Sequence, residues 1–122
     1  MKTKMSFISI VIILFGMALV FAYDMSKHGQ TVTIQGEVLD SACYFTHEAK
    51  GTGHADCATK CVQKGIPMAL LDSKGELYLL NEDHEKPKAY EQAKTMAAKK
   101  VTVTGKLIEN KGWKVLFVED VK

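Results

Sequence analysis

Residues 31–39 read Thr31-Val32-Thr33-Ile34-Gln35-Gly36-Glu37-Val38-Leu39. Apolar and polar side chains alternate along this stretch, and Val32, Ile34 and Val38 share one face. A repeat of two residues is typical of a β-strand with one buried face. Gly36 lies in the middle, where it predicts a bend or a bulge of the kind that a barrel strand needs to turn a corner. We therefore expect this stretch to form the first strand of a small barrel.

Four more strands are expected downstream, over residues 68–71, 76–80, 101–107 and 113–118. Residues 72–75 (DSKG) have the composition of a hairpin turn between the second and third strands. Residues 110–112 (NKG) form the turn between the last two strands. On the last strand we expect Trp113, Val115 and Phe117 to share one face, with Trp113 packed in the barrel.

Two helices are expected between these strands. The apolar period becomes helical over residues 53–64, and Gly65 with Pro67 ends it. A second helix begins at Pro87 and carries a buried stripe of small and apolar residues, namely Ala89, Ala93, Met96 and Ala97. The order strand, helix, strand, strand, helix, strand, strand predicts a mixed, mainly β fold. We expect a five-stranded OB-like Greek-key barrel with a Cys/His-bearing helix inserted after strand 1 and a second helix between strands 3 and 4.

Residues 31–122 resemble the small exported bacterial OB-fold proteins, through the bend at Gly36 and the strand pair over residues 101–121. The resemblance implies the fold and export, and function does not follow from that fold. One OB-fold relative, the periplasmic haem chaperone of cytochrome c maturation, attaches haem through a histidine late in its chain. This sequence has no histidine after His84, so that activity is not carried over and haem is the less expected ligand.

The N-terminal residues have the layout of a targeting segment. Lys2 and Lys4 precede an uncharged stretch over residues 5–23, and the next charge is Asp24. This pattern predicts a signal peptide or an N-terminal membrane helix over residues 1–23, followed by a polar tether over 24–30 and the OB-like domain over 31–122. The two lysines should stay cytoplasmic, which sends the domain to the periplasm or the extracytoplasmic face of the cytoplasmic membrane.

Composition argues against a nucleic-acid partner. The chain has 122 residues, enough for one small domain, and its 16 basic residues are all lysine. Arginine is the side chain that usually grips phosphates and bases in pairs of hydrogen bonds, and the chain has none. Beyond Lys2 and Lys4 the lysines are balanced by acidic residues. We therefore expect a membrane contact through the N-terminal helix and an envelope protein as partner.

The three cysteines all lie between the first and second expected strands. On a helix with about 100° per residue, His54, Cys57 and Cys61 project within roughly 60° of one another. Cys43 and His47 can approach from the preceding loop. These residues predict a metal site of Cys43, His54, Cys57 and Cys61, with His47 as an alternative ligand.

Thiolates are soft ligands, so the expected ion is copper or zinc. Asp40 and Asp56 are candidates for hydrogen bonds that orient a ligating histidine. The expected role is metal handling, or support of a metalloprotein or electron-transfer assembly in the envelope.

Two other interpretations of the cysteines stay open. Extracytoplasmic cysteines commonly form disulfides, and one bridge from Cys43 would leave a spare thiol in an interaction module without metal. Alternatively, Cys57 and Cys61 belong to the core with their neighbours Ala58 and Val62. Enzymatic activity is not expected, because the chain shows no acid–base partner for a nucleophilic hydroxyl.

Overall fold

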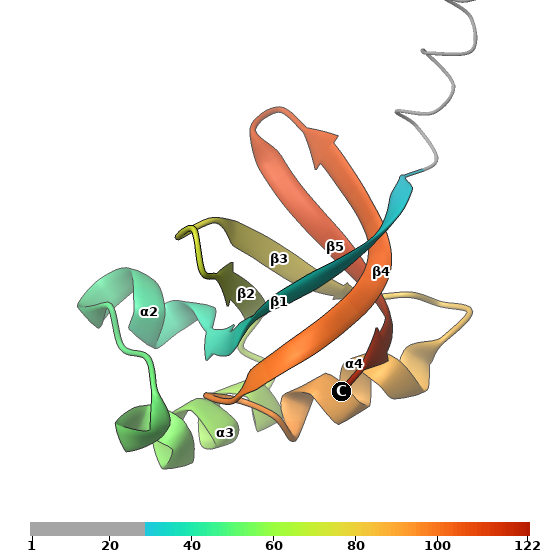
Figure 1. Ribbon diagram of the computed structural model, residues 1–122. Helices are drawn as coiled ribbons and strands as arrows, with labels where there is room; N and C mark the ends of the chain where they lie inside the picture. The colour runs from blue at the N-terminus through green and yellow to red at the C-terminus, as the bar shows by residue number, and fades with distance from the viewer. Residues whose placement is uncertain (1–28) are drawn as a thin grey trace, which may run out of the picture.

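The computed structural model describes residues 29–122. The predictions for the leader and for residues 24–28 of the tether lie outside these residues. Five strands close into a barrel in the order β1-β2-β3-β5-β4 (Figure 1). The strands are β1 (Gln30–Asp40), β2 (Met68–Asp72), β3 (Leu77–Glu82), β4 (Lys100–Asn110) and β5 (Trp113–Val121). The expected mainly β, five-stranded barrel is confirmed, and it is compatible with an OB-like fold.

Strand β1 joins the two halves of the barrel. Its first part pairs with β4, from Gln30 opposite Leu107 onward, and its second part pairs with β2. Both pairings are antiparallel, whereas β3 and β5 run parallel. Gly36 belongs to both ladders, and a Cβ atom there would lie 2.5 Å from the carbonyl oxygen of Leu71. A glycine is therefore required at this point because the neighbouring backbone comes too close for any side chain.

Three helices and a 3-10 turn accompany the barrel within the described residues. They are α2 (Ser41–His47), η1 (Thr52–His54), α3 (Ala55–Gln63) and α4 (Pro87–Lys94). Helix α4 packs against β5 and β3, and buries Ala89 and Ala93 as expected. None of the helices in residues 29–122 combines the length and hydropathy that a membrane crossing requires.

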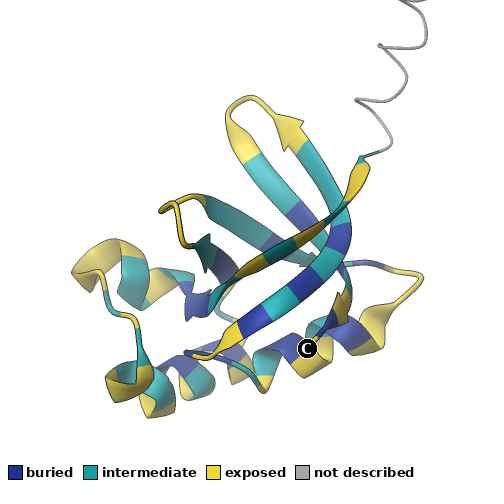
Figure 2. Cartoon of the chain, viewed as in Figure 1, coloured by how far each residue is buried: buried dark blue, intermediate teal, exposed yellow. Residues whose placement is uncertain are grey.

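The core fills the inside of the barrel and continues under α3 and α4 (Figure 2). Its centre consists of side chains with no more than 1% exposure, including Val38, Leu70, Leu80, Leu116 and Val118. Burial of such side chains stabilises a fold by about 1.5–3 kcal/mol each. The barrel thus has its own apolar core, made without the cysteine-bearing segment except for the inner face of α3.

The expectation that Trp113 packs in the barrel is wrong. Trp113 is 65% exposed, and the inward face of β5 is made by Leu116 and Val118. Trp113 pairs with Asn110 at the tip of the β4–β5 hairpin. Pairing of β1 with β4 ends at Leu107, and pairing of β3 with β5 begins only at Val115, so no third strand pairs with the hairpin tip that carries Trp113.

The cysteine-bearing segment contains one more helix than expected. Residues 41–47 were predicted to be a loop, and they form α2. Asp40 explains the difference, because its carboxylate accepts a hydrogen bond from the Cys43 backbone N–H and caps the helix. The second helix of the segment begins with the turn η1, so its regular part α3 starts at Ala55 instead of Gly53.

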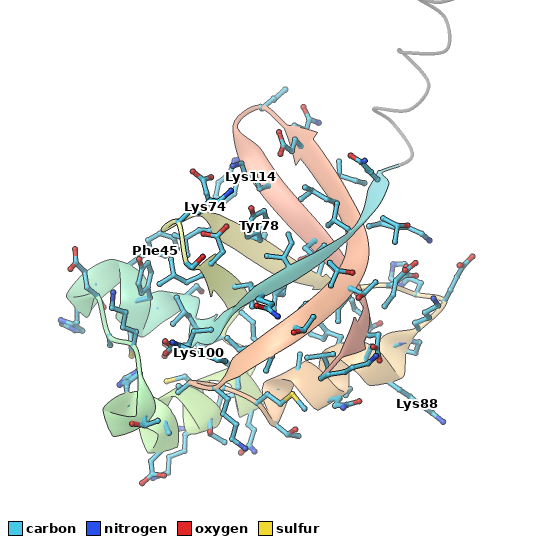
Figure 3. All side chains as sticks on the ribbon, in the orientation of Figure 1. Phe45, Lys74, Tyr78, Lys88, Lys100 and Lys114 are labelled. Atoms are coloured by element: carbon cyan, nitrogen blue, oxygen red, sulfur yellow. The ribbon has the colours of Figure 1, made fainter. Side chains whose placement is uncertain are left out.

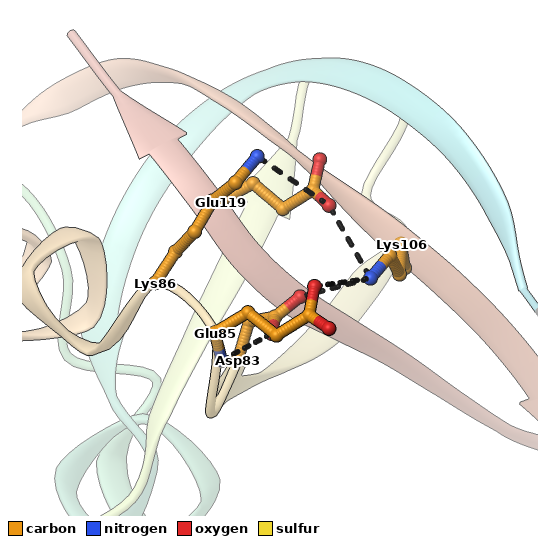
Figure 4. A network of polar contacts seen from close by, with 5 residues as sticks. All are labelled: Asp83, Glu85, Lys86, Lys106 and Glu119. Atoms are coloured by element: carbon orange, nitrogen blue, oxygen red, sulfur yellow. Dashed lines mark hydrogen bonds and ion pairs between the residues drawn. The ribbon is translucent and has the colours of Figure 1, made fainter.

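A polar network closes the side of the barrel next to α4 (Figure 4). Lys106 of β4 contacts Asp83, Glu119 and Glu85 at 3.3, 3.6 and 3.8 Å, and Lys86 contacts Glu119 at 3.8 Å. A hydrogen bond from the Glu85 backbone N–H and the nearby Lys106 ammonium lower the pKa of Asp83, against the opposing effect of burial. The network fastens the β3–α4 loop to β4 and β5.

Candidate metal centre

The candidate centre lies where β1 ends and the inserted helices begin (Figure 1). Asp40 is the last residue of β1, Cys43 lies in the first turn of α2, and His54 closes η1. Cys57 and Cys61 follow on α3. Residues separated by up to 21 positions in the chain thus meet at one end of the barrel.

Asp40 connects the two sides of this centre. Its side chain is fully buried, with Oδ1 2.8 Å from the Cys43 backbone nitrogen and Oδ2 2.9 Å from Nε2 of His54. One carboxylate therefore begins α2 and orients the imidazole. The sequence predicted Asp40 for this second role, and the hydrogen bond to His54 is present.

A second acidic side chain holds the loop that carries His54. Glu37 of β1 accepts a hydrogen bond from the backbone N–H of Gly51. The carbonyl of Gly51 in turn accepts from the His54 N–H at 3.0 Å. The sequence analysis missed Glu37. Its signal was weak, because a polar residue on a strand ordinarily faces solvent.

Helix α3 presents its cysteines beside the core. Ala58 and Val62 are buried, with 1% and 0% exposure, and they anchor the helix on the barrel. Cys57 is exposed and Cys61 is partly buried. The interpretation of both cysteines as core residues is therefore wrong for Cys57.

The ligand atoms form two overlapping groups. Those of Cys43, His54 and Cys57 lie within 4.8 Å of one another, and so do those of Asp40, Cys43 and Cys61. Cys43 belongs to both groups. The predicted residues are thus found as two overlapping groups of three, each close enough to hold a metal ion, and not as one group of four.

Hydrogen bonding and burial raise the pKa of two of the thiols, those of Cys43 and Cys61. A hydrogen bond with the Asp40 carboxylate, followed by burial, raises the pKa of the Cys43 thiol to about 12. Burial, followed by the neighbouring Cys57 thiol, raises the pKa of Cys61. At Asp40 burial acts to raise the pKa, but the hydrogen bonds from Cys43 and His54 outweigh it and lower the pKa. A cation entering the site would have to displace the thiol protons, because the thiolate is the form that binds metal.

Other expected residues stay outside both groups. His47 is exposed in the last turn of α2, and Asp56 is exposed in the first turn of α3. Neither belongs to the groups found among the described residues. All three cysteines are free thiols in the structure, so no bridge joins Cys43 to α3.

In comparisons with known proteins, no family model, curated protein or solved structure matches the chain.

Proposed function

We propose that this protein binds one soft transition-metal ion, copper(I) or zinc, through Cys43, His54, Cys57 and Cys61. The observation that carries the proposal is the position of Cys43, whose sulfur lies within 4.8 Å of ligand atoms from His54, Cys57 and Cys61. Three thiolates and an imidazole are the ligands that these ions prefer. Haem iron is a less favoured occupant.

The site needs little rearrangement to hold such an ion. Zinc–thiolate bonds of about 2.3 Å place tetrahedral sulfurs about 3.8 Å apart. Within each group of three, where the ligand atoms lie within 4.8 Å of one another, they would have to close by at most about 1 Å. If Nε2 of His54 donates its proton to Asp40, Nδ1 is left to face the metal. The buried carboxylate would then fix both the ring orientation and the tautomer.

The exposure of Cys57 supports a role in metal handling. A structural zinc site is usually closed by its four ligands. Here one ligand is exposed at the surface, where the thiolate of an envelope protein could compete for the ion. We propose metal transfer or support of an electron-transfer assembly, rather than catalysis, with neither an enzymatic reaction nor a nucleic acid involved.

We propose that this activity lies outside the cytoplasm, and the uncharged stretch over residues 5–23 supports this location. It would retain the protein at the extracytoplasmic face of the cytoplasmic membrane. The mass of the mature protein tests this location: an anchored chain keeps residues 1–23 and fractionates with membranes, whereas a cleaved chain loses them and appears in the soluble envelope fraction.

The test of the metal site is a measurement of bound copper, zinc and iron in the purified full-length protein, together with free thiols. We expect one ion per chain, lost in Cys57→Ser and Cys61→Ser. His47→Ala is the matched control, because this histidine lies outside the ligand groups and should leave the stoichiometry unchanged. A metal-free chain with one free thiol and a mass about 2 Da lower would instead establish the disulfide-bonded interaction module, since each bridge removes two hydrogens.

A further inference from the structure

The largest exposed aromatic groups of the described residues lie on two different parts of the molecule. Phe45 is 69% exposed on α2, beside the metal centre, and Trp113 is 65% exposed at the tip of the β4–β5 hairpin. Figure 3 labels Phe45 at the α2 end, while Lys114, the neighbour of Trp113, lies on the hairpin. The two aromatic residues therefore report on different surroundings.

The hairpin tip lies at the end of the barrel where the chain enters. Gln30 is paired with Leu107, and an added Cβ at Gly29 would lie 3.1 Å from Cγ1 of Ile108. Strands β1 and β4 are antiparallel, so the residues of β4 after Leu107 extend past the first residue of β1. Three further residues carry the hairpin about 10 Å past this pairing. Figure 1 shows the tip and the start of β1 at the same end of the barrel.

Covalent geometry ties the same end to the uncharged stretch. Residue 23, the last of that stretch, is six residues from Gly29. Six residues span at most about 20 Å when fully extended. If residues 5–23 lie in a bilayer, the start of β1 is held within that distance of its surface, and the projecting tip at the same end of the barrel lies within reach of it.

The chemistry of the tip suits the region of lipid headgroups. Trp113 has an apolar ring and a polar N–H, a combination enriched at membrane–water interfaces. Lys111 and Lys114 flank it, together with the acidic residue Glu109. Lys114 also contacts Glu76, so Lys111 is the cation most available to anionic lipid.

We propose that the β4–β5 hairpin tip, through Trp113 and Lys111, contacts the surface of an anionic membrane and orients the domain on it. This inference rests on the membrane anchor of the proposed function. It also predicts where the metal centre lies relative to the membrane, because Asp40 is at the other end of the 11-residue strand β1. A strand of that length spans about 30 Å, so the site would face soluble partners instead of lipid.

Trp113 is the only tryptophan of the chain, so its fluorescence tests the proposal directly. The full-length protein is reconstituted into vesicles containing equal amounts of phosphatidylcholine and phosphatidylglycerol, with and without bromine on the upper acyl chains. We expect the emission of Trp113 to shift to the blue relative to the protein in detergent. Brominated lipid should reduce the emission by about half or more, since the ring would lie at the interface.

The matched control is the double variant Trp113→Phe, Phe45→Trp, which moves the fluorophore to an equally exposed position beside the metal centre. Its emission should not respond to brominated lipid. Lys111→Glu in the natural chain should weaken the quenching of Trp113, because it places a negative charge against the anionic surface.

Flotation of the same vesicles separates the two ways of failing. If the chain floats and Trp113 is not quenched, or both tryptophan positions are quenched equally, the tip contact is overturned and the anchor stands. If the chain does not float, the anchor is lost and the tip contact with it. Metal stoichiometry is measured on the same preparation, so the proposed binding site is judged independently of either result.

Discussion

The barrel and the inserted segment of residues 40–61 are held together in different ways. The barrel closes around side chains such as Leu70 and Leu116, which have no exposed surface. In the segment, α2 and η1 contain no buried residue, and α3 contributes Ala58 to the core, with Val62 directly after the segment. The segment instead depends on hydrogen bonds that the carboxylates of Asp40 and Glu37 accept. The barrel should therefore fold without metal, whereas the order of the segment should respond to it.

The largest effect should come from breaking the barrel alone. Leu116→Ala removes a fully buried side chain from the inward face of β5 and should lower the free energy of unfolding by about 4 kcal/mol. Urea denaturation measures the loss. Under native conditions the variant should still bind one ion per chain, and a variant that folds but loses its metal would show that the two regions are not separate.

Metal binding should have the next largest effect and should act on the segment. At a free zinc concentration about 100 times the dissociation constant, binding adds about 2.7 kcal/mol to the free energy of unfolding. Hydrogen exchange should show new protection over residues 40–61 and little change in β4. Equal protection across the barrel would contradict a local effect, and Cys57→Ser should abolish the response.

Asp40 is buried at the boundary between the barrel and the segment, so substitutions there should affect both stability and metal affinity. Asp40→Ala removes the cap of α2 and the partner of His54, and should cost about 1–2 kcal/mol of stability. Loss of such an orienting partner also typically weakens metal affinity by about 10–100-fold. A chelator competition assay measures the second effect.

Asp40→Asn is the matched variant, because asparagine also caps helices well. It should recover most of the stability and only part of the affinity, since the carboxylate charge is gone. If Asp40→Ala and Asp40→Asn bind the metal with equal affinity, the role of Asp40 is limited to capping α2.

The smallest effect concerns the ion pairs on the barrel. The pKa of Asp83 is lowered from the usual 3.8, so its ionised form stabilises the fold above that value, and the contribution is lost as the pH falls through the lowered pKa. Lys106→Met removes one source of this shift. The urea midpoints of wild type and variant should differ at neutral pH and converge in acid. A constant difference would assign the role of Lys106 to packing of its aliphatic chain.

Much of the barrel could be predicted from local patterns. Alternation along residues 31–39 and the stripe of Ala89 and Ala93 depend on geometry that repeats every two or 3.6 residues, so both were found in the sequence. The spacing of His54, Cys57 and Cys61 is also a local pattern that can be found in the sequence, because helical geometry places these positions on one side. The helix α2 was missed because its start depends on one hydrogen bond, from the Cys43 N–H to the Asp40 carboxylate. A short segment can form several other local hydrogen bonds, and the sequence does not show which one is made.

Long-range placement required the folded barrel. The sequence analysis expected Cys43 in the site and kept His47 as an alternative ligand. The capping of α2 by Asp40 brings Cys43 toward α3 and leaves His47 exposed. The same holds for Trp113, whose exposure depends on how far β4 and β5 extend past β1. Local repeats are properties of a few consecutive residues. A contact between residues 14 positions apart, such as Asp40 with His54, exists only where strand pairing has already placed the ends of the loop.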